Sequence, residues 1–274
     1  MSSADVSPPG QPGVSQWLKL ARAAASTPPA SARAELRLGA AEKVIGSIDP
    51  VLAARMSVAG LALRRHGAAW VVEGAADASL AAIARWLHQE RICTHWRDEL
   101  LPVVDGDGHS LAVVERSVVR VLGLKTFAVH LAGRSPDAGA WVQRRAFDKA
   151  TDPGRWDTLM GGQVTAGETT QATLERETME EAGLAMTDLQ ALERCPDISV
   201  CRPVDEGYMV EHIAVFRAVV PEGRVPENRD GEVERFECLH QDALLERLCA
   251  DLFTLEATLI LGAELERRDE APSS

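Results

Sequence analysis

The stretch GGQVTAGETTQATLERETMEEAGL, residues 161–184, joins a glycine-rich turn to a strongly acidic segment. Thr169 suits the N-cap position of a helix, because its hydroxyl accepts a hydrogen bond from a free backbone N–H. Gly183 suits the position just past a helix end, where the backbone often turns left-handed. The pattern therefore predicts a helix from about residue 170 to residue 182.

The acidic face of this helix raises a question of charge balance. A helix turns about 100° per residue, which places Glu177, Glu180 and Glu181 on one face and Leu174 on an adjacent face towards the core. Acidic faces are usually solvated or paired with basic residues three or four positions further on. Arg176 is the only basic residue in the helix, and no Lys or Arg follows the glutamates at that spacing. The pattern favours a hard divalent cation as the compensating charge.

Composition limits the classes of partner. The chain has 274 residues, of which 46% are hydrophobic, so it is long enough for two domains with packed cores. Its net charge of −12 argues against nucleic acid and membranes as partners. Because a negatively charged protein repels anions, a phosphate substrate would need cations close to its binding site. Five irregularly spaced cysteines and a start without a signal-peptide pattern predict a cytoplasmic protein.

Apolar patterns outline the domains. We expect a disordered tail over 1–13, an N-terminal α/β domain over 14–123, a second domain over 124–268 and a polar tail over 269–274. The expected strands are 68–74, 126–133, 140–147, 198–202, 208–219 and 232–239, with a hairpin over 99–115. The expected helices are 78–92, with Asp77 as N-cap, then 116–124 and 241–268. Strands and helices without strict alternation indicate an α+β class.

The opening stretch resembles the Nudix box, the signature of Nudix hydrolases. The residues that match its fixed or apolar positions are Gly162, Glu168, Arg176, Glu177, Glu180, Glu181, Gly183 and Leu184. Thr178 stands where an aliphatic residue is usual, which is a mild departure because Thr also packs as a β-branched residue. Seven identical matches arise by chance on the order of 10⁻⁸ times per starting position, given average residue frequencies.

The resemblance implies a fold, a cofactor and roles for these residues. It implies a Nudix α/β/α sandwich with a mixed sheet, and hydrolysis of a diphosphate linkage with Mg²⁺, or alternatively Mn²⁺. The implied metal ligands are the carbonyl of Gly161 and the carboxylates of Glu177, Glu180 and Glu181. The implied catalytic set is Glu168, Arg176, Glu177 and Glu181, in which Glu168 and Arg176 brace the loop against the helix. The general base varies within the family, and its candidates are Glu177, Glu181, Glu206, Glu211 and Glu232.

The flanking segments narrow the resemblance. Residues 140–162 and 202–239 are similar to the Nudix group related to the C-terminal part of yeast-type thiamine pyrophosphokinase. Members of that group convert thiamine diphosphate and its oxidised derivatives to monophosphates, which makes such a small molecule the expected substrate. The resemblance implies a substrate-binding set of Arg144, Arg145, Lys149 and Glu232. Asp157 is interpreted as a turn residue before Gly161.

The sequence is also compatible with other functions. The same machinery would serve ADP-ribose, NADH or another nucleoside diphosphate, and a Nudix fold can also be a binding module without turnover. Isopentenyl diphosphate isomerase shares the fold but lacks the complete box. The N-terminal domain is expected to cover the site, recognise the organic half of the substrate or form a homodimer. Trp141 and Trp156 are interpreted as core residues rather than stacking platforms, and Cys93 with His95 is too small a set for a zinc site.

Overall fold

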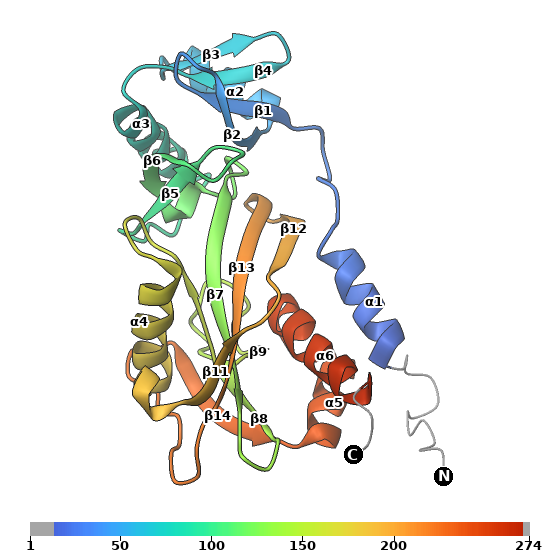
Figure 1. Ribbon diagram of the computed structural model, residues 1–274. Helices are drawn as coiled ribbons and strands as arrows, with labels where there is room; N and C mark the ends of the chain where they lie inside the picture. The colour runs from blue at the N-terminus through green and yellow to red at the C-terminus, as the bar shows by residue number, and fades with distance from the viewer. Residues whose placement is uncertain (1–13, 271–274) are drawn as a thin grey trace.

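The computed structural model describes residues 14–270 (Figure 1). The tail expected over 1–13 lies outside the described residues, as do residues 271–274. The chain forms an N-terminal α/β region followed by a larger mixed sheet with helices on both faces. The α+β class and the layered sandwich expected from the sequence are therefore confirmed.

The N-terminal region contains a four-stranded sheet in the order β2-β1-β4-β3 and a separate hairpin, β5–β6. Their bounds are β1 Ala34–Leu38, β2 Lys43–Ile48, β3 Leu63–His66, β4 Ala69–Val72, β5 Leu100–Val104 and β6 Ser110–Glu115. Two helices, α2 Pro50–Val58 and α3 Ala76–Gln89, pack with them around one buried cluster. The expected strand at 68–74 and the expected hairpin are confirmed, whereas the sheet partners β1, β2 and β3 were not predicted.

Helix α3 follows its predicted apolar spacing, because Leu80, Ile83 and Leu87 are all buried. Its start differs from the prediction. The helix begins at Ala76, and Asp77 does not cap it; the Asp77 carboxylate instead accepts a hydrogen bond of 2.8 Å from the backbone N–H of Val113 in β6. A long-range partner has replaced the local one that the sequence pattern indicated.

The C-terminal sheet has the order β11-β13-β7-β8-β14, with β10 paired to β7, β12 to β13 and β9 to β8. Its strands are β7 Lys125–Arg134, β8 Ala140–Arg145, β9 Trp156–Asp157, β10 Met160–Gln163, β11 Gln190–Arg194, β12 Ile198–Val204, β13 Gly207–Val219 and β14 Val233–Leu239. The sheet is mixed, since β7 and β13 run parallel and their other neighbours run antiparallel.

Helices cover this sheet on both faces. Helix α4 Thr170–Ala182 packs on one face, where Leu174 and Ala182 join a buried cluster with β7 and β13 residues. On the other face lie α1 Val14–Ala24, α5 Gln241–Cys249 and α6 Leu255–Glu270 (Figure 1). The result is a three-layer arrangement in which the site is carried by α4 and the strands beneath it.

Two expected helices differ from the structure. Only Arg116–Val118 of the segment 116–124 is helical, as a short 3₁₀ turn. The expected helix over 241–268 is broken into α5 and α6, because the backbone between them pairs with β9: the Trp156 N–H donates to the Leu252 carbonyl, and the Thr254 N–H donates to the Trp156 carbonyl. Phe253 is buried at this break.

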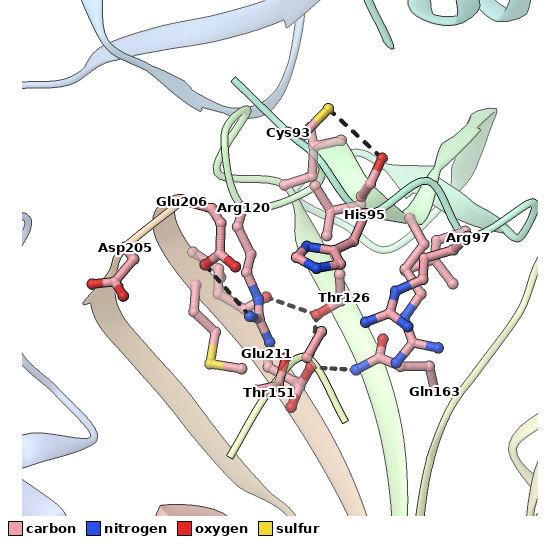
Figure 2. Close-up of a pocket in the computed structure, with 18 of the residues that line it drawn as sticks. Cys93, His95, Arg97, Arg120, Thr126, Thr151, Gln163, Asp205, Glu206 and Glu211 are labelled. Carbon is pink, nitrogen blue, oxygen red and sulfur yellow. Dashed lines mark hydrogen bonds and ion pairs between the residues drawn. The ribbon is translucent and has the colours of Figure 1, made fainter. Parts of the chain in front are cut away.

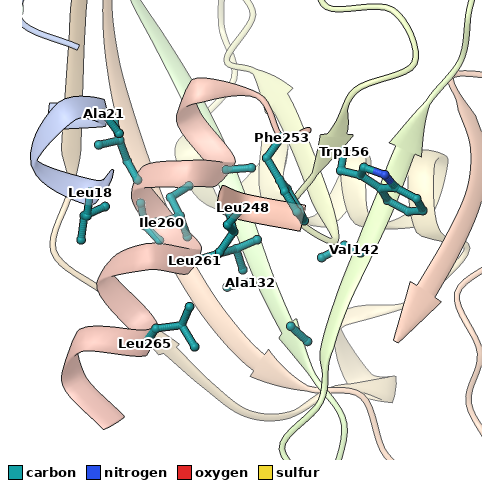
Figure 3. Close-up of a cluster of buried hydrophobic side chains, with 14 of the residues drawn as sticks. Leu18, Ala21, Ala132, Val142, Trp156, Leu248, Phe253, Ile260, Leu261 and Leu265 are labelled. Carbon is teal, nitrogen blue, oxygen red and sulfur yellow. The ribbon is translucent and has the colours of Figure 1, made fainter. Parts of the chain in front are cut away.

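Helix α1 lies on the C-terminal sandwich rather than on the N-terminal sheet. Leu18 packs so closely on α6 that a Cβ added at Gly262 would lie 2.6 Å from its Cδ1 (Figure 3). We propose a domain division near residue 123, which the separate buried clusters support, with α1 packed against the second domain although it precedes the first. Backbone hydrogen bonds join the two regions, from Tyr208 N–H to the Arg120 carbonyl and from Ala166 N–H to the Leu100 carbonyl.

Leu174→Ala should lower the free energy of unfolding by about 2–5 kcal/mol, because it opens a cavity beneath α4 at a fully buried position. Chemical denaturation measures the change. Glu175→Ala, at an exposed position on the same helix, is the matched control and should stay within about 0.5 kcal/mol. A loss below about 1 kcal/mol at Leu174 would contradict the packing described here.

Candidate metal and diphosphate site

The caps of α4 set where its acidic side chains lie. The Thr169 hydroxyl accepts a hydrogen bond of 3.1 Å from the Ala172 N–H, and Gly183 adopts a left-handed conformation with φ +64°. The helix therefore begins at Thr170 and ends at Ala182, which confirms the predicted bounds. The face carrying Glu177 and Glu181 is turned towards β10 and its glycines.

Glu181 is the most deeply placed of the glutamates, with a side chain only 1% exposed. Its Oε2 accepts hydrogen bonds from the Gly161 N–H at 3.0 Å and from Gln143 Nε2 at 2.9 Å. Its Oε1 lies 3.6 Å from Lys149 Nζ. Helix α4, strand β10 and strand β8 thus meet at one carboxylate.

Glycine is required beside Glu177. A Cβ added at Gly162 would lie 2.1 Å from the Glu177 carboxyl carbon, and one added at Gly161 would lie 2.6 Å from the His130 ring. Any larger residue at these two positions would push the carboxylate or the ring out of place. The glycine pair that opens the acidic stretch is explained by this close approach.

Arg176 organises the remaining carboxylates. It forms a two-pronged pair with Glu168, from Nε at 2.7 Å and from Nη2 at 2.9 Å, and these bonds hold the pKa of Glu168 at about 2. Its Nη1 also donates to Glu177 Oε1 and to Glu180 Oε2, both at 2.9 Å. The expectation that the acidic face has no basic partner was therefore wrong, because it considered only residues that follow the glutamates in the helix.

Arg176 does not fully compensate the buried charge. Burial, and next the charge of Glu181, raise the pKa of Glu177 to about 7. Burial also raises the pKa of Glu181. Two neighbouring carboxylates held away from water are stabilised by a cation, and carboxylate oxygens are the ligands that hard divalent ions prefer. These residues fit such an ion, with the more exposed Glu180 at the rim.

A cleft of about 610 Å³ opens over Glu177 and Glu180, whereas the buried Glu181 is not among the residues that line it. The residues expected from the sequence that line it are Gly161, Arg145, Lys149, Arg176, Glu177, Glu180, Glu211 and Glu232. Glu206 does not line this cleft; it is exposed and lies 3.7 Å from Arg120. The cleft mixes cationic and acidic groups, as a site for a phosphate compound with a bound cation would require.

Arg144 and Arg145 point in different directions, because successive side chains of a strand alternate between the faces of the sheet. Arg145 faces the cleft and lies 3.3 Å from Asp157. Arg144 donates to the Gly154 carbonyl and stacks over Phe147 and Trp156, and it is not among the residues that line the cleft. Lys149 contacts both Glu232 and Glu181.

The two tryptophans and Asp157 have the structural surroundings that were expected. Trp156 is buried in the core beneath three arginines, and Trp141 packs against the cluster under α4. Asp157 accepts a hydrogen bond of 2.8 Å from the Thr158 N–H in the turn before Gly161. Cys93 is buried and receives a hydrogen bond from Ser117, with no converging set of metal ligands around it among residues 14–270.

Glu256 is a cleft residue that the sequence did not indicate. It lies at the start of α6, is 7% exposed, and has a buried Oε1 without a hydrogen-bond partner. Burial, and next the charge of Glu211, raise its pKa to about 7. In the sequence it is one acid in an amphipathic helical pattern, so no local signal distinguishes it from a solvated residue.

The fold and this site define a NUDIX domain, and residues 125–257 match the family of that description. The chain is similar to Nudix hydrolase 24, chloroplastic, of Arabidopsis thaliana, with 28% identity over 165 residues, which is 58% of this chain and 44% of the relative. The chain thus spans less than half of that relative's length.

Shorter relatives match as well. An uncharacterized Nudix hydrolase, orf19 of Rhodococcus erythropolis, is 38% identical over 35% of this chain and 52% of its own. An isopentenyl-diphosphate Delta-isomerase of Cutibacterium acnes is 30% identical over 50% of this chain and 71% of its own. The crystal structure of DR0079 from Deinococcus radiodurans has a TM-score of 0.49 at 20% identity, covering 61% of this chain and 98% of that one.

The relatives of Arabidopsis thaliana and Rhodococcus erythropolis are named as Nudix hydrolases. Nudix hydrolases generally use divalent metals and take small pyrophosphate compounds. No helix among residues 14–270 is long and apolar enough to cross a bilayer.

Glu177→Gln should leave the metal-free protein folded, and slightly more stable at pH 8, because it removes a carboxylate whose ionisation the site disfavours. It should also remove nearly all hydrolysis. Thermal unfolding in a chelator and a hydrolysis assay measure the two effects. Glu175→Gln, exposed on the same helix, should change neither, and loss of folding in Glu177→Gln would show that the residue is structural.

The stability of the metal-free protein should also depend on pH through Glu177. Its folded pKa of about 7 lies above the ordinary value of 4.5, so its protonated form stabilises the fold below about pH 4.5 and this contribution is lost as the pH rises through 7. From pH 4.5 to pH 8, the unfolding free energy of the wild type should fall steadily relative to that of Glu177→Gln. A difference that is independent of pH would contradict this.

Proposed function

We propose that the protein is a Mg²⁺-dependent diphosphohydrolase, with Mn²⁺ as an alternative metal, and that it converts thiamine diphosphate or its oxidised derivatives to the monophosphate. The observation that carries the proposal is the pair of desolvated carboxylates, Glu177 and Glu181, beside glycine backbone under a cleft that is lined by Glu177, Arg145 and Lys149. The sequences flanking the box support the thiamine compounds as the substrate class.

The residues take complementary roles in this proposal. Glu177, Glu180, Glu181 and the Gly161 carbonyl would hold the cation. A bound dication supplies charge neutralisation of the diphosphate oxygens, polarisation of phosphorus and a water of lowered pKa. Arg145 and Lys149 line the cleft with their cationic groups and would bind phosphate oxygens. Glu168 holds Arg176, which keeps Glu177 and Glu180 in place.

The group that accepts the proton of the attacking water is proposed to be a carboxylate that lines the same cleft. Among the candidates later in the chain, Glu211 and Glu232 line the cleft, and Glu206 does not, so we remove Glu206 from the proposal. Glu211 is engaged with Thr126 and Gln163 through one oxygen. Glu232 pairs with Lys149. Of the box glutamates, Glu177 lines the cleft and the buried Glu181 does not, so Glu177 and Glu232 remain as the proposed acceptors.

A panel of substrates tests the reaction. Thiamine diphosphate, its oxidised derivatives, ADP-ribose, NADH and isopentenyl diphosphate are incubated with the protein and Mg²⁺, and the products are separated. We expect the thiamine compounds to yield monophosphate and inorganic phosphate. Glu181→Gln should reduce the rate at least about 100-fold while the protein remains folded, and Glu175→Gln should retain it.

Each other result supports a different function. Preference for ADP-ribose or NADH would indicate a nucleoside diphosphate hydrolase with the same machinery. Isomerisation of isopentenyl diphosphate without phosphate release would favour the activity named for the Cutibacterium acnes relative, which is 30% identical to this chain over 148 residues. Binding of a diphosphate without turnover would indicate a binding module, and would overturn the hydrolase proposal.

A further inference from the structure

A second pocket, of about 260 Å³, lies between the N-terminal region and the C-terminal sheet (Figure 2). Its N-terminal wall includes His95, Arg97 and Arg120, and its opposite wall includes Gln163 of β10 and Glu211 of β13. Figure 2 shows the His95 ring between the side chains of Arg120 and Arg97, with Glu211 and Gln163 below them in this view. We call this space the interdomain pocket.

The interdomain pocket is continuous with the cleft over the box glutamates. Arg97, Arg120, Gln163 and Glu211 line both spaces. Gln163 immediately follows Gly162, which contacts Glu177. A molecule whose diphosphate lies over Glu177 therefore has the interdomain pocket available for its other end.

Two residues that line the interdomain pocket, Gln163 and Glu211, each keep one acceptor atom without a hydrogen-bond partner among the described residues. Glu211 Oε1 accepts from Thr126 Oγ1 at 3.1 Å and from Gln163 Nε2. A carboxylate only accepts, so the Gln163 amide must present its nitrogen to Glu211 and turn its oxygen away. That oxygen, Oε1, is buried and has no partner, and Glu211 Oε2 forms no hydrogen bond with any of residues 14–270.

An acceptor that is buried without a partner is costly in a folded protein, and a ligand that donates to it removes the cost. The N-terminal wall of the interdomain pocket offers flat groups, which are the His95 imidazole and the guanidinium groups of Arg97 and Arg120. Such groups favour the binding of a planar ring. A backbone hydrogen bond of 2.9 Å, from the Tyr208 N–H to the Arg120 carbonyl, joins Arg120 of that wall to β13.

We propose that the interdomain pocket binds the organic half of the diphosphate substrate, and that this half is a flat nitrogen heterocycle whose amino group donates hydrogen bonds to Gln163 Oε1 and Glu211. Gln163 and Glu211 are then specificity-determining residues, and the N-terminal region completes the substrate site through His95, Arg97 and Arg120. The proposal rests on the diphosphatase function proposed above, and it extends to any substrate with such a ring.

Matched substrates that differ by one donor test the proposal. Thiamine diphosphate is compared with oxythiamine diphosphate, and ADP-ribose with inosine diphosphate ribose, in which an oxo group replaces the amino group. For the pair that is hydrolysed, we expect kcat/KM to favour the amino compound by about 10-fold or more, the effect of a hydrogen bond to a buried or charged partner. Gln163→Met should lower this ratio several-fold, because Glu211 is then the only one of the two proposed acceptors that remains.

The N-terminal wall is tested by Arg97→Ala. Arg97 is exposed, and its guanidinium has no partner among residues 14–270, so the variant should fold. We expect a several-fold higher KM for the amino compound with kcat largely retained. Arg85→Ala, an exposed arginine of α3 outside both spaces, is the control and should behave as wild type.

The outcomes separate this inference from the proposed function. Hydrolysis with equal use of amino and oxo compounds, or a ratio unchanged in folded Gln163→Met, overturns the inference and leaves the function standing. If Gln163→Met does not fold, the wild-type ratio and the KM of Arg97→Ala decide. If no compound is hydrolysed, the proposed function fails, and the inference is then tested by calorimetry of the same pairs with Mg²⁺. Tighter binding of the amino compound supports the proposed role of the interdomain pocket. Equal binding of the two compounds, or no binding, overturns it.

Discussion

The buried carboxylate of Glu181 is the contact on which the geometry of the site depends. It ties α4 to the sheet through the Gly161 N–H and the Gln143 amide, and it lies within 3.6 Å of the ammonium group of Lys149. A carboxylate at this depth is tolerated only when polar partners surround it. Because those partners come from β8, β10 and the loop after β8, the helix cannot slide along the sheet without losing several of them at once.

Arg176 controls the charge around this contact. Its guanidinium group spans Glu168, Glu177 and Glu180, so one cation orders the loop before the helix and two carboxylates on the helix. The pKa of Glu177 nevertheless stays raised, because burial and the charge of Glu181 outweigh the pairing with Arg176. The site therefore keeps an excess of negative charge, which is the physical basis for expecting a divalent cation there.

The N-terminal region adds a wall that the NUDIX domain alone does not have. Its arginines reach the cleft from loops that follow α3 and β6, while Gln163 and Glu211 reach it from the sheet. The family match over residues 125–257 does not include that wall. Phosphate chemistry and recognition of the organic group are thus assigned to different parts of the chain in the proposals made here.

The sequence by itself determined the elements whose signals are local. The caps at Thr169 and Gly183, the acidic face of α4 and the apolar spacing of α3 all depend on residues a few positions apart. Tertiary structure alone decided features that depend on distant partners. The pairing of β9 with residues 252–254 breaks the expected long helix, and the alternation of β8 sends Arg144 away from the cleft. The fold also brings Glu256 at the start of α6 into the lining of the cleft. Burial and long-range pairing depend on which segments meet in space, and spacing along the chain does not encode that.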